Sequence, residues 1–155
     1  MTAATAHVLL VNSFDDREMY AEYLRNAGLL VHTAANPEAA LSLLATVPCD
    51  VAITDLVFAS AGLGGASFTR ELRGRLDPAT SIIVISGCVR QEDREEARQA
   101  GADLFLIKPA LPSAVLFEVR RALVMRRHGR RLPWNWRDAA PARTMSGKRN
   151  RSRAS

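Results

Sequence analysis

The stretch LFLIKP at residues 104–109 carries the strongest signal for the fold class, because it joins an apolar run to a cation and a proline. Four consecutive apolar residues predict a short strand that is buried on both faces. Lys108 is the only lysine in the first 147 residues of a chain with nineteen arginines. A lysine ammonium is a compact point charge, whereas a guanidinium is a planar fork of donors. A lysine at this position therefore suggests a specific partner. The X-Pro bond after it is a candidate cis peptide.

Four further apolar runs precede this one, and each is followed by a segment that is predicted to be helical. The predicted strands are residues 8–11, 30–34, 51–53, 82–85 and 104–107. The predicted helices are residues 17–27, 37–44, 67–76, 92–100 and 112–123, with Asn36 as a cap of the second and Gly101 after the fourth. Strict alternation with all-apolar strands predicts an α/β fold, in which a parallel sheet is covered by helices on both faces.

The net charge of +5 is an average over two unlike segments. Residues 1–125 hold eleven basic and fifteen acidic residues, whereas residues 126–155 hold ten basic residues and one acid. We therefore expect one domain over residues 1–125 and a basic tail over residues 126–155, whose composition predicts disorder. Trp134 and Trp136 in this tail would stack on single-stranded nucleic acid, or dock on the domain or on a partner.

The sequence points to a cytoplasmic protein. No apolar run approaches the roughly 18 residues of a membrane span, and the N-terminus lacks the pattern of a secretory signal. Cys49 and Cys88 lack metal-type spacing, so we expect two reduced, buried thiols.

Polar residues follow the predicted strands at the edge where sites form in parallel sheets. Asn12 and Ser13 follow the first strand, and Asp55 follows the third. Ser86 ends the fourth and Lys108 the fifth. The Asp55 carboxylate can attack a phosphoryl group, the Ser86 hydroxyl can donate a hydrogen bond to it, and Lys108 can neutralise its charge.

Residues 1–125 resemble the receiver domain of two-component response regulators along essentially their whole length. The matching segments are residues 8–11, 17–24, 50–56, 82–87 and 101–109. The resemblance implies a flavodoxin-like, doubly wound sheet of five parallel strands in the order 2-1-3-4-5. It also implies a single-domain signalling protein in a phosphorelay and not an enzyme.

The resemblance assigns roles to four residues. It implies that Asp55 is the phosphoacceptor, charged by a histidine kinase or a phosphotransfer protein. Ser86 would be the switch hydroxyl, Lys108 the phosphoryl-binding lysine before a cis proline, and Phe105 the switch aromatic. The surface of residues 92–100, 104–107 and 112–123 would pass the signal to a downstream protein target.

One departure from the family pattern concerns the metal. Where active receivers carry two acids that hold Mg²⁺, this chain has Asn12 and Ser13. Neutral oxygen ligands bind Mg²⁺ less well than carboxylates, so a site of Asn12, Ser13 and Asp55 would be weak or absent. Asp15 or Asp16 would replace the missing acids as a metal ligand. Acids at a helix start are, however, already explained by capping and by the helix dipole.

Three alternatives to phosphoryl signalling stay open. Lys108 would close the pocket on Asp55 without a metal, which gives a phosphorylation-independent pseudo-receiver. The basic tail would make the protein a nucleic-acid-binding regulator. An aspartate-nucleophile phosphatase is the least favoured, since the residues after Asp55 supply no second acid.

Overall fold

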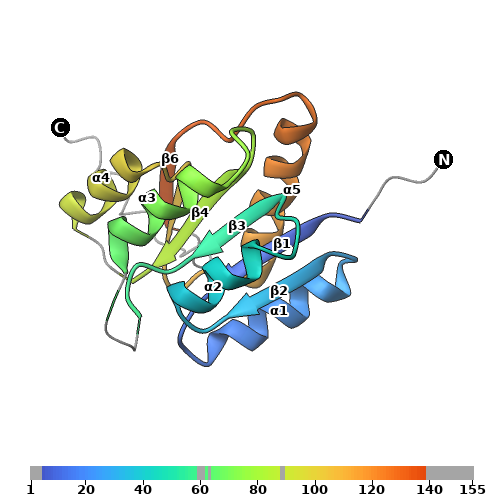
Figure 1. Cartoon of the computed structure of the whole chain (residues 1–155). Helices are drawn as coiled ribbons and strands as arrows, with labels where there is room; N and C mark the ends of the chain where they lie inside the picture. Colours follow the sequence, from blue (N-terminus) through green and yellow to red (C-terminus); the bar gives the residue numbers. More distant parts are fainter. Residues whose placement is uncertain (1–4, 59–61, 63, 88–89, 139–155) are drawn as a thin grey trace, which may run out of the picture.

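The computed structural model describes residues 5–58, 62, 64–87 and 90–138, which fold as six strands and five helices (Figure 1). The strands are β1 (His7–Val11), β2 (Leu30–Ala34), β3 (Val51–Thr54), β4 (Ser81–Ser86), β5 (Leu104–Ile107) and β6 (Asn135–Asp138). The helices are α1 (Asp16–Asn26), α2 (Pro37–Leu44), α3 (Gly65–Arg75), α4 (Gln91–Ala100) and α5 (Pro112–Arg127).

All neighbouring strands pair in parallel, in the order β2-β1-β3-β4-β5-β6. The predicted fold class and the order 2-1-3-4-5 are confirmed, with one strand added beside β5. Because the strands run the same way, their carboxyl ends meet along one edge of the sheet.

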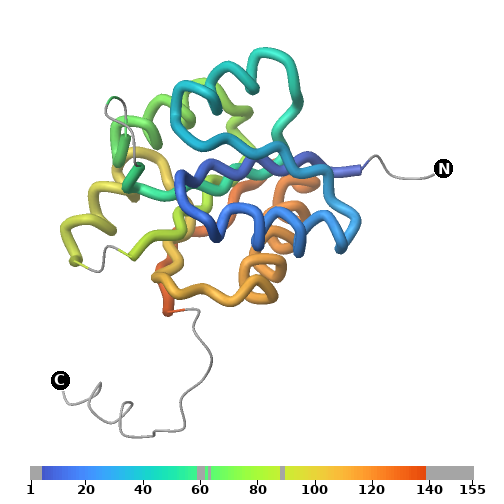
Figure 2. The backbone as a smooth tube through the Cα atoms, turned by 90° about the horizontal axis from the view of Figure 1, so that it is seen from below, coloured from blue at the N-terminus to red at the C-terminus, as the bar shows by residue number. Residues whose placement is uncertain are grey.

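Alternate strand residues feed two separate apolar clusters, as the two-residue period of a strand requires. Val8 and Leu10 of β1 pack with buried residues of α1 and α5, whereas Leu9 and Val11 pack with buried residues of α2, α3 and α4. Figure 2 shows the same layers, with blue α1 and orange α5 on one side and cyan α2 and green α3 on the other. The sheet is thus buried on both faces.

Local signals set the predicted boundaries. The Asn36 side chain accepts a hydrogen bond from the Ala39 amide at 2.8 Å and so caps α2. Gly101 ends α4 with a φ of 116°, a left-handed conformation that favours glycine. The Lys108–Pro109 peptide is cis, as the sequence suggested.

The segment after residue 125 differs from the disordered tail that its composition predicts. α5 continues to Arg127, and residues 128–134 return the chain to the free edge of β5, where β6 pairs. The average composition of these thirty residues does not reveal two apolar side chains that pack on the domain. Leu132 is buried, and Trp134 packs against the cluster under α3 and α4. Docking of a tryptophan on the domain is therefore confirmed for Trp134. Residues 139–155 lie outside the described part of the chain.

Two further sequence expectations concern the membrane and the thiols. Within the described residues, no helix combines the length and the apolar character that crossing a bilayer requires. Cys49 is a free thiol, and burial raises its pKa to about 12. Cys88 lies outside the described residues.

Candidate functional site

The candidate site lies where β3, β4 and β5 end. Asp55 follows β3, and its amide donates to the Val11 carbonyl at 3.1 Å. Lys108 follows β5, and its amide donates to the Ser86 carbonyl at 2.9 Å. These backbone bonds bring three of the predicted site residues to one edge of the sheet.

The Asp55 carboxylate is engaged through both oxygens and is only 4% exposed. Its Oδ2 accepts a hydrogen bond from Lys108 Nζ at 2.6 Å. Its Oδ1 accepts hydrogen bonds from the amides of Leu56 at 2.6 Å and Val57 at 3.3 Å. The pairing of Lys108 with Asp55 that the sequence suggested is therefore present, and the turn after β3 holds the other oxygen.

Lys108 also binds the carboxylate of Asp16. The position of Asp16 at a helix start does not by itself predict this contact. Lys108 Nζ lies 3.5 Å from Asp16 Oδ2 as well as 2.6 Å from Asp55 Oδ2. Burial alone would lower the pKa of Lys108, but the hydrogen bond to Asp55 and the charges of Asp55 and Asp16 outweigh it, so the pKa is raised. The ammonium stays charged and is shared by two acids.

Asp16 reaches the pocket because the connection from β1 to α1 is short. α1 begins at Asp16, and the side chain of the preceding Asp15 makes no capping hydrogen bond. The Asn12 amide donates to Asp16 Oδ1 at 2.8 Å and orients this carboxylate toward Lys108. The length of this connection is the sequence signal that favours Asp16 over Asp15.

The side chains in place of the usual acids make contacts with other protein groups. Asn12 offers its NH₂ group to Asp16, while its Oδ1 accepts from the Phe14 amide at 2.8 Å. The Ser13 hydroxyl donates to the Ala35 carbonyl at 2.6 Å. Among the described residues, no group of three or more acids, histidines or cysteines is arranged to hold a metal ion. Mg²⁺ prefers oxygen ligands near octahedral positions, and the donors here are already used by protein groups.

Charge in the pocket is nearly balanced. The two carboxylates of Asp16 and Asp55 face the Lys108 ammonium, and Arg17 Nη1 donates to the Asn12 carbonyl at 2.7 Å. The Phe14 ring also lies near Lys108, with 5.5 Å between its centre and Nζ. Neither a divalent cation nor a phosphoryl dianion meets a strongly opposite charge there.

The two predicted switch residues are both buried. Ser86 is the last residue of β4 and is inaccessible to solvent. Phe105 in β5 is also fully buried, in the cluster that Trp134 packs against. Its ring therefore points inward, into this apolar cluster.

Comparison with other proteins agrees with this arrangement. A family model described as the response regulator receiver domain matches residues 8–120. A response regulator receiver protein of Anaeromyxobacter sp. is 33% identical over 110 residues, which cover 71% of this chain and 45% of that protein. Transcriptional regulatory protein AruR of Pseudomonas aeruginosa is 32% identical over 134 residues, which cover 81% of this chain and 52% of that protein. The chain spans about half the length of these relatives.

Solved structures show the same fold. Chemotaxis protein CheY4 of Vibrio cholerae matches with a TM-score of 0.70 and 29% identity, over 77% of this chain and 100% of that one. A CheY-like receiver domain protein of Methanospirillum hungatei matches with a TM-score of 0.74 and 20% identity, over 81% of this chain and 99% of that one. This chain belongs to the family of response regulator receiver domains.

Proposed function

We propose that this receiver domain acts in two-component signalling as an interaction module whose state does not depend on phosphorylation of Asp55. The observation that carries the proposal is the orientation of Asn12, which turns its NH₂ group and not its oxygen toward the pocket. The Lys108 ammonium contacts Asp16 and Asp55, the two carboxylates that would hold a metal.

Electrostatics support a pocket that stays closed. The hydrogen bond from Lys108 to Asp55 is short and charge-assisted, and it is made at a buried carboxylate. A metal ion that entered would have to displace Lys108 from Asp55. An aspartyl phosphate would carry about two negative charges beside Asp16, where the Asp55 carboxylate carries one. Both steps work against the present balance of charge, so the pair is suited to hold one state.

A second candidate is phosphoryl transfer to Asp55 from a histidine kinase or a phosphotransfer protein. It is favoured by Asp55, Ser86 and Lys108 at adjacent strand ends and by the second carboxylate, Asp16. In that case an Asp55 oxygen attacks phosphorus, a new O–P bond forms, and the N–P bond to the donor histidine breaks. Lys108 would then move from the carboxylate to the phosphoryl oxygens.

Intact-mass measurement after incubation with a small phosphodonor and Mg²⁺ separates these candidates. We expect no phosphoryl adduct on the wild-type chain, but an adduct on Asn12→Asp, which returns an acid to the pocket. The adduct on Asn12→Asp should be absent in Asn12→Asp/Asp55→Asn. A wild-type adduct that disappears in Asp55→Asn would overturn the proposal and support the second candidate.

The family defines the partners only in class. Receiver domains are signalling modules that interact with kinases or phosphotransfer proteins and with downstream targets. Nucleic-acid binding through the basic tail and a cytoplasmic location stay predictions. Deletion of residues 139–155, the part of the predicted tail after β6, should abolish a salt-sensitive gel shift if that part binds nucleic acid.

A further inference from the structure

The outer edge of β5 is occupied by a strand of the same chain. β5 pairs with β4 on one side and with β6 on the other, where Leu104 to Ile107 lie opposite Asn135 to Asp138. Without β6, the outward backbone groups of β5 would form an open edge, which is a ready template for another extended segment. We call residues 130–138 the β6 segment.

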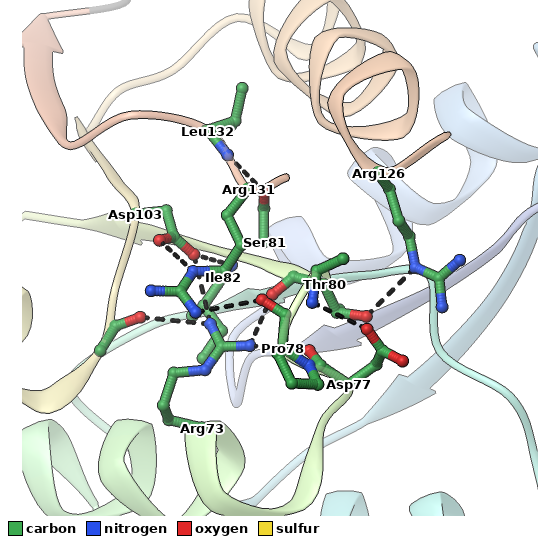
Figure 3. A network of polar contacts seen from close by, with 12 residues as sticks. Arg73, Asp77, Pro78, Thr80, Ser81, Ile82, Asp103, Arg126, Arg131 and Leu132 are labelled. Carbon is green, nitrogen blue, oxygen red and sulfur yellow. Dashed lines mark hydrogen bonds and ion pairs between the residues drawn. The ribbon is translucent and has the colours of Figure 1, made fainter. Parts of the chain in front are cut away.

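The start of the β6 segment is firmly attached at the amino ends of β4 and β5 (Figure 3). Arg131 donates to Asp103 Oδ1 at 2.9 Å and to the Pro78 carbonyl at 3.1 Å. The buried Leu132 donates its amide to Ser81 Oγ at 2.9 Å. Removal of the whole segment would therefore disturb the domain, and movement is expected beyond Leu132.

Side-chain contacts lie on both faces of β6. Arg94 of α4 lies over the Trp136 ring at 4.0 Å. On the other face, Arg137 Nη1 lies 2.8 Å from Glu118 Oε2 of α5. Glu118 is only 3% exposed and also binds Arg121 of the same helix at 2.7 Å. A buried carboxylate in this position selects for a guanidinium.

Two observations indicate that β6 fits this edge imperfectly. Within the described part of the chain, the Nε atom of Arg137 is buried and makes no hydrogen bond. A hollow of about 340 Å³ also lies between α4 and the β6 segment, lined by Gln91, Arg94, Glu95, Trp134 and Trp136. Buried polar atoms in well-fitted contacts are normally paired, so a better-fitting segment could replace this one.

From these contacts we propose that the edge of β5, between Arg94 and Glu118, is a binding site for an extended peptide segment of a partner protein. Residues 134–138 are its intramolecular occupant. The partner segment runs parallel to β5 and carries an aromatic residue at the place of Trp136 and an arginine at the place of Arg137. Strand addition supplies the backbone bonds, and the two side chains supply specificity. The proposal stands whether or not Asp55 is phosphorylated.

The test uses the full-length chain with Arg137→Ala, and Arg130→Ala as the matched control. Arg130 is an exposed arginine of the same segment that makes no contact with Glu118. We expect Arg137→Ala to speed amide hydrogen exchange of β5 and β6 about tenfold, because a charge-assisted bond is lost, while β1 and β3 keep their protection. Arg130→Ala should exchange as the wild type does.

A synthetic peptide of residues 133–138 then probes the vacated edge by NMR. It should shift β5 amide resonances of Arg137→Ala at lower concentration than those of the wild type. A peptide with alanine in place of arginine should not. Glu118→Gln should also loosen β6. It should bind the peptide more weakly than Arg137→Ala does, because the carboxylate that binds the arginine has been removed. Unchanged exchange in Arg137→Ala, or equal binding of the two peptides, would overturn the proposal.

Discussion

Two nearly buried aspartates at opposite ends of the sheet are neutralised in different ways. Asp55, at the carboxyl ends of the strands, binds one ammonium that it shares with Asp16. Asp103, before β5, binds Arg73 of α3 at 3.4 Å and Arg131 at 2.9 Å. The first arrangement closes the pocket with one compact ammonium, whereas the second joins three parts of the chain through rigid guanidinium groups.

Asp103, Arg73 and Arg131 are called the Asp103 cluster. This cluster fixes the positions of the segments that it joins more than it adds to the stability of the fold. Burial raises the pKa of Asp103 even though the Ile82 amide and two guanidiniums oppose the shift. Desolvation of the carboxylate thus outweighs its partners, as in many buried ion pairs. The Asp103 cluster therefore joins separate segments of the fold, whereas at the Asp55 pocket one shared ammonium closes the site.

Replacement of Asp103 should have the largest effect on folding. Asp103→Ala leaves two guanidiniums without their shared partner, so we expect a loss of about 3–5 kcal/mol in the free energy of unfolding. Urea denaturation measures it. Glu71→Ala, which removes an exposed pair with Arg75, should cost less than about 1 kcal/mol. Equal losses in the two variants would contradict a structural role for the Asp103 cluster.

Replacement of Lys108 should cost less, because the Leu56 and Val57 amides still bind Asp55. We expect Lys108→Met to lose about 2 kcal/mol, the usual worth of a hydrogen bond to a charged group. Lys108→Met/Asp55→Asn should recover most of that loss, since no unpaired charge remains. Urea denaturation of these two variants and of Asp55→Asn alone gives the coupling. Additive losses would show that the two side chains do not stabilise each other.

The pH dependence of the same pair gives a smaller effect. The folded-state pKa of Lys108 is raised, so its contribution is complete below the unfolded pKa of about 10.4 and is lost as pH rises through the folded value. The stability difference between wild type and Lys108→Met should therefore shrink at strongly alkaline pH. A difference that stays constant across that range would contradict a raised pKa.

Most of the sheet could be predicted from local patterns, because apolar runs, caps and glycines act within a few residues. β2 and β5 begin and end at the predicted residues, and Asn36 caps α2 as expected. β6 could not be predicted in this way. Its sequence is polar and mostly exposed, and it becomes a strand only because the edge of β5 is available.

The site could be predicted as far as the strand ends determine it. Asp55, Ser86 and Lys108 follow from the positions of their strands, since adjacent parallel strands end together. The position of Asp16 depends on the three-dimensional path from β1 to α1, and acids at a helix start have an ordinary explanation. The orientation of Asn12 depends in turn on Asp16, so periodicity alone could not predict it.

Titration of the ¹⁵N-labelled chain with Mg²⁺, followed by NMR, tests most directly whether the pocket is closed to metal. We predict no saturable change in the amide resonances of Asp55, Leu56 and Lys108 at millimolar Mg²⁺. The same titration of Asn12→Asp should give saturable shifts, because a carboxylate replaces the amide that faces Asp16. Saturable binding by the wild-type chain at the Asp55 pocket would contradict the account.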